Sequence, residues 1–463
     1  MKFKFYLAKN EEELVLDYNN ETSELRRENG DIIVPQDLFH DYIPAYKMNA
    51  GKRELAKIKI QLGLKCNYSC EYCSQRFVPR NPNDSYAAEE LDSIEIDTFI
   101  KKFDDLSVGE KLHFEMWGGE PFLYFDKMKT ITEQLHDKYP NATFSVITNG
   151  SIINQEIIDF IQKYQFSVAI SHDGVGQKTR GPDPLDDPEQ KKWLFKLRNL
   201  LVPENRFSVN AMIHKDNDSR SEVQRWIRNN FGMVTIGEGG TVDAYDEGGM
   251  SMSWQSEEEH IAYRRKAFSD VMHRKIDQFN VVNMKIENFI TSLREQRPSS
   301  MLGQKCQMDR PDNISVDLNG NVTTCQNVTA SSNNVDGISH HIGTMDDLEA
   351  VDIKTGTHWS DREECPKCPV LHLCQGSCLF LSPNSKEWGL SCDNSYSDNV
   401  VWLAAGLYEL TGYTLYRIES SDLPEYRKDV FGFNTTKYAV ENQNNDKILD
   451  SNTNFVKDSK THD

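Results

Sequence analysis

The stretch AKIKIQLGLKCNYSCEYC (56–73) decides how this chain folds. It opens with an apolar, β-branched run that is typical of a buried strand. The run passes directly into three cysteines within eight residues, Cys66, Cys70 and Cys73. Closely spaced thiols immediately after a strand predict a metal-binding loop at the end of that strand.

The same strand-then-helix pattern repeats along the chain. We expect six strands, at 56–64, 111–117, 143–149, 166–171, 207–214 and 233–237. Helical patterns follow them at 96–106, 125–139, 154–164, 189–201, 220–231 and 257–276. Strands alternating with helices form parallel sheets, so we predict an α/β fold with a partial (β/α)6 barrel over 56–280. The chemistry of such barrels lies at the carboxyl ends of the strands, which puts the cysteine loop at the mouth.

Seven further cysteines form a second group, and none lies between Ser74 and Lys305. The second group is Cys306, Cys325, Cys365, Cys368, Cys374, Cys378 and Cys392. It falls in a loop-rich segment, 281–400, with short strand patterns at 313–318 and 321–325, where we expect metal to supply order. Ordinary core cysteines would be spread along the chain. A structural zinc site has four ligands, whereas the first loop contains three thiols. Three thiols favour an iron–sulfur cubane with one open iron.

The two ends of the chain differ from the barrel. Residues 1–55 contain a predicted strand pair, 2–8 and 13–18, and a charged connector. This pair either caps the barrel, the interpretation we favour, or receives a peptide by β-addition. Residues 401–463 are expected to form the last segment of the chain. It consists of a closing helix, whose pattern spans 400–413, and a disordered polar tail from about Thr435.

Composition limits the classes of function. The 463 residues hold 52 Lys and Arg against 72 Asp and Glu, a formal net charge of −20 that repels nucleic acid and anionic lipid. We find no apolar run long enough for a transmembrane helix and no signal peptide at the beginning. We therefore expect no nucleic-acid or membrane partner, a cytoplasmic location and cysteines that are not disulfides.

The strand ends carry motifs that resemble those of the radical S-adenosylmethionine (SAM) enzymes. Cys66-x3-Cys70-x2-Cys73 resembles the triad that holds the SAM-binding [4Fe-4S] cluster, whose reduction splits SAM into a 5′-deoxyadenosyl radical. The resemblance implies that the SAM contacts are Tyr72 by the adenine, Gly118, Gly119 and Glu120 (of GGEP) at the ammonium, Thr148 and Asn149 (of TNG), Ser171 and Asp173 near the ribose, and Arg180 at the carboxylate.

The second cysteine group resembles the SPASM domain, which carries two auxiliary iron–sulfur clusters. Its pattern is C-x13-G-x4-C through Gly320, then C-x2-C-x5-C-x3-C and Cys392. The resemblance implies an outer cluster on Cys365, Cys368, Cys374 and Cys392. It implies an inner cluster on Cys306, Cys325 and Cys378 with one position left open, because 299–305 contains no cysteine.

The resemblance also implies a reaction on a ribosomally made precursor peptide, with a reductant such as flavodoxin or ferredoxin. We expect an intramolecular cross-link (C–C, ether or thioether) at an unactivated side-chain carbon. Formylglycine-forming relatives place an Asp base directly after the second motif cysteine, whereas this chain has Gln326, an amide that cannot accept a proton. Alternatives are a sulfatase-maturating enzyme, a small-molecule SPASM dehydrogenase or a non-catalytic metal-binding scaffold.

Candidate catalytic bases follow the last two barrel strands. They are Glu238, Asp243, Tyr245 and Asp246, with His214 and Asp216 as further possibilities. Their position after strands is the only support for these residues.

Overall fold

The computed structural model describes residues 1–41, 54–73, 75, 93–333, 336–351, 357–378, 381–383 and 385–432. A nine-stranded sheet in the order β12-β11-β10-β4-β5-β6-β7-β8-β9 forms its largest layer. Its six barrel strands are parallel neighbours: β4 (Leu55–Gln61), β5 (Val108–Trp117), β6 (Thr143–Thr148), β7 (Ser167–Ser171), β8 (Phe207–Ile213) and β9 (Thr235–Thr241). The predicted α/β class and all six predicted strands are confirmed.

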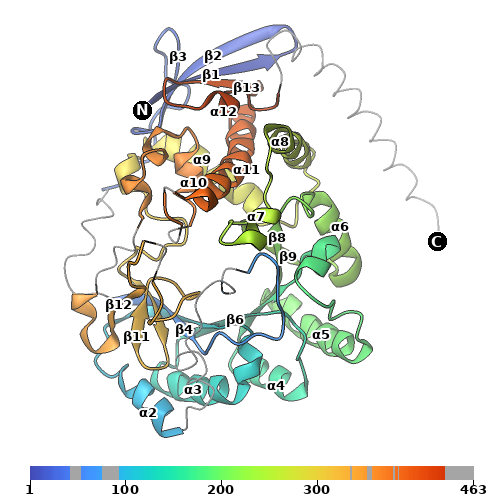
Figure 1. Cartoon of the computed structure of the whole chain (residues 1–463), viewed down its shortest axis with the longest axis vertical. Helices are drawn as coiled ribbons and strands as arrows, with labels where there is room; N and C mark the ends of the chain where they lie inside the picture. Colours follow the sequence, from blue (N-terminus) through green and yellow to red (C-terminus); the bar gives the residue numbers. More distant parts are fainter. Residues whose placement is uncertain are drawn as a thin grey trace.

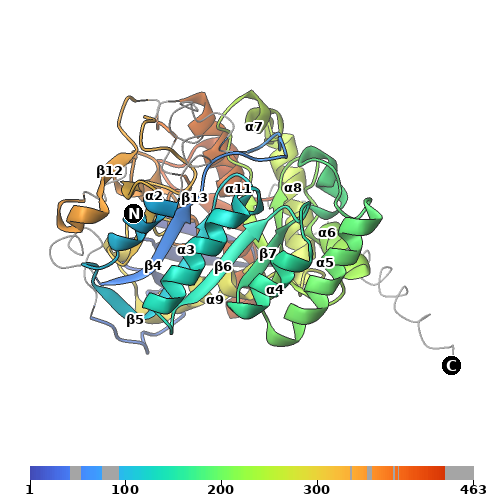
Figure 2. The same cartoon turned by 90° about the horizontal axis from the view of Figure 1, so that it is seen from below.

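Helices cover one face of this sheet (Figure 2). They are α2 (Ser93–Lys101), α3 (Phe125–Lys138), α4 (Gln155–Lys163), α5 (Pro188–Leu201) and α6 (Arg220–Phe231). β8 shows why the sheet has two kinds of face: Phe207, Val209 and Ala211 are buried, while the residues between them are half-buried. A strand turns successive side chains to opposite faces, so the other face is left to line the barrel interior.

The cysteine-rich segment continues the barrel sheet. β10 (Asn313–Asp317) pairs in parallel with β4, and β11 (Asn321–Thr323) and β12 (His341–Thr344) follow antiparallel. Gly320 makes the tight turn between β10 and β11 with φ +82°, a conformation that favours glycine. The glycine of the second cysteine pattern therefore shapes the hairpin that leads to Cys325.

A separate four-stranded sheet joins the two ends of the chain. Its order is β13-β1-β2-β3, from β13 (Thr414–Glu419), β1 (Lys2–Lys9), β2 (Glu12–Asn19) and β3 (Glu24–Arg27). The predicted pair β1–β2 is confirmed. The sheet packs on α9 (Val281–Glu295), where the rings of Tyr18 and Phe289 lie 6.2 Å apart, and lies at the far end of the molecule from β4 and β6 (Figure 1). The expectation that it caps the barrel is wrong, because its apolar face is used by the helices of the C-terminal half.

Both edges of this small sheet are covered by the chain itself. The amide of Ile33 donates to Leu25 O (2.8 Å) beside β3, and Arg417 of β13 bridges to Asp429. A peptide joining either edge would have to displace these contacts. The sheet is therefore a poor acceptor for β-addition.

The remaining helices connect the barrel to the small sheet. They are α7 (Glu247–Ser251), α8 (Glu257–Met272), α10 (Leu371–Cys374), α11 (Lys386–Thr411) and α12 (Glu425–Lys428). α11 begins fourteen residues before the expected closing helix and includes Cys392, so it crosses the boundary predicted at 400. A buried ion pair, Arg220–Asp398 at 2.7 Å, ties α6 of the barrel to α11.

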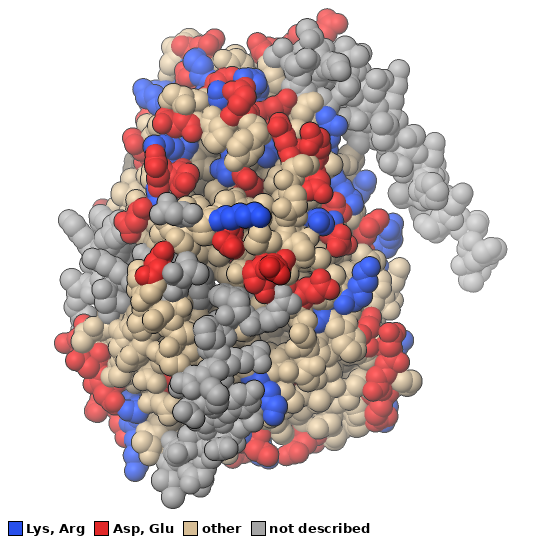
Figure 3. All heavy atoms as spheres, viewed as in Figure 1, with Lys and Arg blue, Asp and Glu red and all other residues tan. Residues whose placement is uncertain are grey.

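The expected polar tail lies outside the described residues, as do residues 42–53 of the predicted connector. Among the described helices, none combines the length and the apolar character that a membrane crossing requires. Figure 3 shows acidic and basic side chains interspersed over one face, in keeping with a net charge that comes from many scattered carboxylates.

Candidate active site and auxiliary cysteine sites

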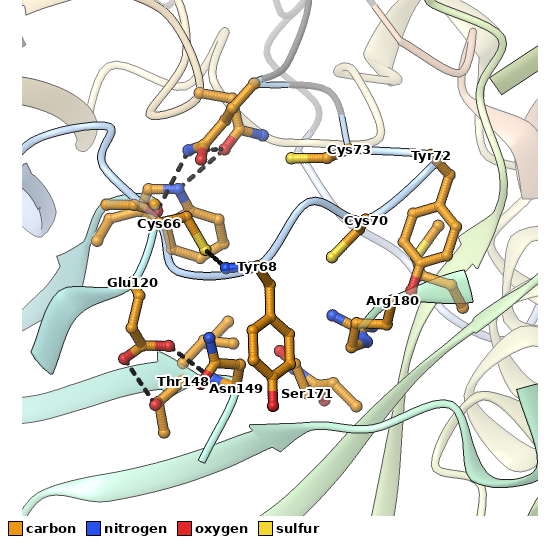
Figure 4. A pocket seen from close by; sticks show the side chains of 18 of the residues that line it. Cys66, Tyr68, Cys70, Tyr72, Cys73, Glu120, Thr148, Asn149, Ser171 and Arg180 are labelled. Atoms are coloured by element: carbon orange, nitrogen blue, oxygen red, sulfur yellow. Dashed lines mark hydrogen bonds between the residues drawn. The ribbon is translucent and has the colours of Figure 1, made fainter. Parts of the chain in front are cut away.

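The carboxyl ends of β4–β8 surround a cavity of about 400 Å³ that is open to solvent (Figure 4). All three cysteines of the first loop line it. So do most of the residues expected to contact SAM, namely Tyr72, Gly118, Gly119, Glu120, Thr148, Asn149, Ser171 and Arg180. The fold thus brings strand ends up to about 150 residues apart in the sequence, from Gln61 to Ile213, to one place, as parallel strands must.

The thiol of Cys70 is held in a low-dielectric environment. Burial raises the pKa of Cys70 to about 12, with smaller contributions from Cys73 and Cys66, while Arg180 acts in the opposite direction. Without a cation the Cys70 thiol therefore stays protonated. A metal cluster would supply the positive charge that lets it bind as a thiolate.

Two glycines let the end of β5 touch the first loop. Gly119 N donates to Gly63 O (2.9 Å), and Glu120 N donates to Lys65 O (2.9 Å). A Cβ added at Gly118 would stand only 2.7 Å from Gly63 O, and one at Gly119 would overlap the carbonyl of Lys65. The Gly-Gly pair therefore sets the close approach that leaves bare backbone in the cavity wall beside the cysteines.

Glu120 ties the end of β5 to the end of β6. Its carboxylate is buried and accepts hydrogen bonds from Phe122 N (3.1 Å), Thr148 Oγ1 (2.7 Å) and Asn149 N (2.7 Å) (Figure 4). Burial raises the pKa of Glu120 to about 7, although these three hydrogen bonds favour the ionised form. Its first role in this geometry is to orient the strand ends.

Replacing Glu120 with alanine is expected to lower the free energy of unfolding by at least about 1–3 kcal/mol, since three buried donors lose their acceptor. The raised pKa of Glu120 means that its contribution to stability decreases as the pH rises towards 7. The difference from wild type should thus be larger at pH 6 than at pH 8. Denaturant unfolding under argon measures it, and Asp126→Ala, an exposed acid, serves as control. Equal stabilities of Glu120→Ala and Asp126→Ala would contradict this role.

Asp173 holds Arg180 rather than facing the cavity. Its fully buried carboxylate accepts from Tyr72 Oη, from Arg180 Nη2 (2.9 Å) and from Met212 N (2.9 Å). Asp173 is not among the lining residues, which leaves Ser171 as the nearer candidate of the expected ribose pair. Asp173 therefore holds the side chains of Tyr72 and Arg180 in place.

Arg180 is a half-buried cation, and one of its donors has no hydrogen-bond partner. Its guanidinium lies over the ring of Tyr72, 5.6 Å from the centroid, and its Nε is buried without a partner. An unpaired buried donor on a cation beside a cavity fits an anionic ligand group, such as the carboxylate expected for SAM.

Two of the candidate bases, Asp243 and Tyr245, line the same cavity. Asp243 accepts from Ser377 Oγ (3.0 Å) and from Tyr245 Oη (3.3 Å), and Tyr245 Oη lies 3.0 Å from Cys378 Sγ. Burial raises the pKa of Asp243 above its ordinary value, while Lys305 opposes the shift. A chain of contacts thus runs from the cavity wall to a cysteine of the expected inner cluster.

The other candidate bases lie elsewhere. Asp246 caps α7 by accepting from Gly249 N (2.9 Å), His214 is fully buried with Nε2 at 3.3 Å from Thr179 Oγ1, and Asp216 is exposed. None of these three lines the cavity. The side chain of Glu238 lies outside the described residues, although its backbone belongs to β9.

Amide and aromatic side chains that we did not predict complete the wall. Asn327 Oδ1 accepts from Trp117 Nε1 (2.9 Å) and Gln75 Nε2 (3.2 Å), and Gln326 Oε1 accepts from Lys59 Nζ (3.2 Å). Asn210 and Met212, on the inner face of β8, also line the cavity. The period-two pattern of β8 could have identified the last two, whereas no sequence signal marks Gln75 or Asn327.

The structure gathers the four cysteines of the expected outer set around a second, much smaller cavity. Cys365, Cys368, Cys374 and Cys392 line it together with Trp388, Tyr396 and Arg427. Of the expected inner set, Cys325 and Cys378 pack with Leu64, Val328 and Tyr245, and Cys306 is exposed. Among the described residues, no three Cys, His, Asp or Glu side chains form a site for a single metal ion.

The turn between β2 and β3 holds the loop of the outer cysteines. Asn20 Nδ2 donates to Pro366 O (3.0 Å) and Cys368 O (2.9 Å), and the carbonyl of Asn20 lies 2.8 Å from His372 Nε2. Asn20 is fully buried. The small N-terminal sheet therefore braces the outer cysteines, a role that the sequence did not reveal.

Replacing Asn20 with alanine is expected to speed the loss of iron from the outer cysteines to a ferrous chelator, because two loop carbonyls lose their donor at a cost of about 1–3 kcal/mol. Asn29→Ala removes two hydrogen bonds from an exposed turn and is the matched control. Identical rates of iron release for Asn20→Ala and Asn29→Ala would contradict the bracing role.

Comparison with known proteins agrees with this geometry. Residues 60–227 match the model of the radical SAM superfamily. The chain contains a radical SAM domain. The match begins in β4 and ends in α6, so it covers the cysteine loop and the strand ends described above. The predicted resemblance is thereby confirmed.

Proteins similar to this chain differ in their activities. It is 19% identical to the serine-type anaerobic sulfatase-maturating enzyme of Klebsiella pneumoniae over 68% of this chain and 80% of that one. It is 23% identical to the radical SAM cyclopropyl synthase TigE of Paramaledivibacter caminithermalis over 35% of this chain, and the match spans only 36% of TigE. The structure of anSMEcpe with bound AdoMet and Cp18Cys peptide aligns with a TM-score of 0.54 at 16% identity, over 77% of this chain and 98% of that one, which shows a shared fold.

Proposed function

We propose that this protein is a radical SAM peptide maturase that forms an intramolecular cross-link in a ribosomally made precursor peptide. The observation that carries the proposal is the single cavity that joins the thiols of the first loop to Asp243, Tyr245 and, through Tyr245, Cys378. In such a cavity a radical would form beside the first-loop thiols. In the other wall, Asp243 would take up a proton, and a cluster held by Cys378 would be the electron acceptor next to it.

The residues present fit the cofactors of this class. Cys66, Cys70 and Cys73 would hold the cluster, the bare backbone at Gly118 and Gly119 leaves room for the amino group of SAM, and the unpartnered Nε of Arg180 would meet its carboxylate. When bound, cluster and SAM supply a 5′-deoxyadenosyl radical that takes a hydrogen atom from a substrate carbon. The second cysteine group would hold two auxiliary clusters, as in SPASM proteins.

The chain's own residues would complete the reaction. After a hydrogen atom is removed, bond formation requires that the substrate lose one proton and one electron. Asp243 would take the proton, because its raised pKa makes it a better base than an ordinary aspartate. Tyr245 donates to Asp243 and contacts Cys378, so a cluster held by Cys378 would lie next to the base and would be the group able to accept the electron.

A second candidate is formylglycine formation on a sulfatase. The alignment over 80% of the Klebsiella pneumoniae enzyme favours it. Gln326 cannot act as the base at the position where that branch carries Asp, but Asp243 lies in the same cavity and could do so. The two candidates therefore differ in substrate rather than in the first steps.

Co-expression with peptides encoded beside the gene tests the proposal. Mass spectrometry should find a peptide that has lost two hydrogens, and its fragmentation should be blocked between the two joined residues. Formylglycine gives the same mass change but reacts with hydrazines, so a hydrazine adduct would favour the second candidate. SAM cleavage without any change in peptide or sulfatase would point to a small-molecule substrate and overturn the proposal.

A further inference from the structure

We propose that two buried arginines outside the cysteine motifs, Arg362 and Arg427, raise the reduction potentials of the auxiliary clusters. The geometry points to Arg427 acting on the outer cluster alone and Arg362 acting on both. This inference rests on the proposed function, because it assumes that the second cysteine group holds two clusters.

Arg427 touches a cysteine of the outer set directly. Its Nη2 lies 3.2 Å from Cys392 Sγ, and it is one of the residues that line the outer cavity. Its guanidinium forms an ion pair with the Asp393 carboxylate, with Nε 3.0 Å from Oδ1, and lies 4.9 Å from the ring centroid of Tyr396. These contacts hold a buried cationic donor against the sulfur of Cys392, where it forms a charge-assisted hydrogen bond to a thiolate.

Arg362 lies between the two cysteine sets. Its guanidinium donates to Gly376 O (3.0 Å), Cys378 O (2.8 Å) and Leu381 O (3.1 Å), which places it on the segment of the inner ligand Cys378. Its other face stacks at 3.5 Å on the ring of Trp388, which lines the outer cavity. Arg362 is 1% exposed and its Nε is buried without a partner.

The partners of Arg362 in these contacts are carbonyls and a ring, all of them neutral, so they orient the charge without cancelling it. Cysteines of both sets lie within its electrostatic reach: Cys365, Cys374, Cys392 and Cys378. In a low-dielectric interior a fixed positive charge favours the more negative, reduced state of a neighbouring cluster. Both arginines would therefore make the auxiliary clusters better acceptors for an electron that leaves the substrate.

The test is a redox titration of the full-length reconstituted protein, followed by electron paramagnetic resonance. Replacing Cys66, Cys70 and Cys73 with alanine in every sample removes the first cluster, so that only auxiliary signals remain. In this background we expect Arg427→Gln to move one potential to a more negative value and Arg362→Gln to move both. A shift that changes the electron-transfer equilibrium tenfold corresponds to 59 mV for one electron.

Conservative variants separate charge from packing. Arg427→Lys and Arg362→Lys keep the charge, so they should shift the potentials less than the glutamine variants do. If Arg362→Gln fails to assemble, the contrast between Arg427→Gln and Arg427→Lys decides the matter. Arg206→Gln, at the amino end of β8 and away from the cysteines, is the control and should shift neither potential.

Unchanged potentials in both glutamine variants, or in Arg427→Gln where Arg362→Gln does not assemble, would overturn the inference. Lysine variants that shift the potentials as far as the glutamine variants do would overturn it as well. A wild-type protein that binds only about four iron atoms instead of about twelve would overturn the proposed cofactor set instead.

Discussion

A variant with alanine in place of Cys66, Cys70 and Cys73 is expected to release no 5′-deoxyadenosine from SAM above background. These three thiols line the cavity and make up the whole first cysteine group. Without them the expected SAM-binding cluster has no cysteine ligand in the first loop. The variant should keep the iron of the second group, and its iron content should fall by about a third, as expected if one of three cubanes is lost. Chromatography of the reduced reaction mixture and iron analysis measure both effects.

Cys392→Ala is the matched control, because it removes one thiol of the outer set and leaves the first loop intact. It should still cleave SAM. The proposed radical chemistry would be contradicted if the first-loop variant cleaved SAM as well as Cys392→Ala does.

Asp243→Asn is expected to separate SAM cleavage from product formation. The amide cannot accept a proton, so peptide product should fall by about 10²–10⁴-fold while 5′-deoxyadenosine is still released. The contacts with Ser377 Oγ and Tyr245 Oη can both be kept by the amide oxygen or by rearrangement of these hydroxyls, which makes a purely structural loss a poor explanation. The ratio of product to 5′-deoxyadenosine, measured in one reaction, reports the effect.

The pH dependence gives a second readout for Asp243. Because burial raises its pKa, product formation in the wild type should decline as the pH falls through that raised value, where the carboxylate becomes protonated. Asp270→Asn is the control. Asp270 is a buried acid that accepts from Ser221 N (3.1 Å), and its replacement should keep both the ratio of product to 5′-deoxyadenosine and the pH profile. A product ratio in Asp243→Asn equal to that of Asp270→Asn would assign the proton to another group.

The barrel could be predicted because its information is local. Each strand is a short apolar run, each helix has its own period, and Asn154, Ser219 and Ser256 mark helix beginnings as caps. The cavity followed from the same pattern, since parallel strands bring their carboxyl ends together and the cysteine loop comes directly after the first of them.

Contacts between distant segments could not be predicted in this way. Asn20 meets the carbonyl of Cys368 across 348 positions, and Arg427 reaches Cys392 from a short helix beyond the last cysteine. Neither residue belongs to a period or a motif. Asp173 shows the opposite case, in which the motif was recognised but the fold turned the carboxylate inward, towards Arg180 and Tyr72.

The pairing of β1 with β13 has a consequence for biogenesis. Lys4 faces Glu419, so β1 leaves the ribosome long before β13, its second neighbour in the sheet. The barrel can mature during translation, but the turn that carries Asn20 reaches its final support only after β13 has been made. The proposed outer cluster should accordingly be loaded after β13 has emerged, whereas the first loop can be loaded earlier.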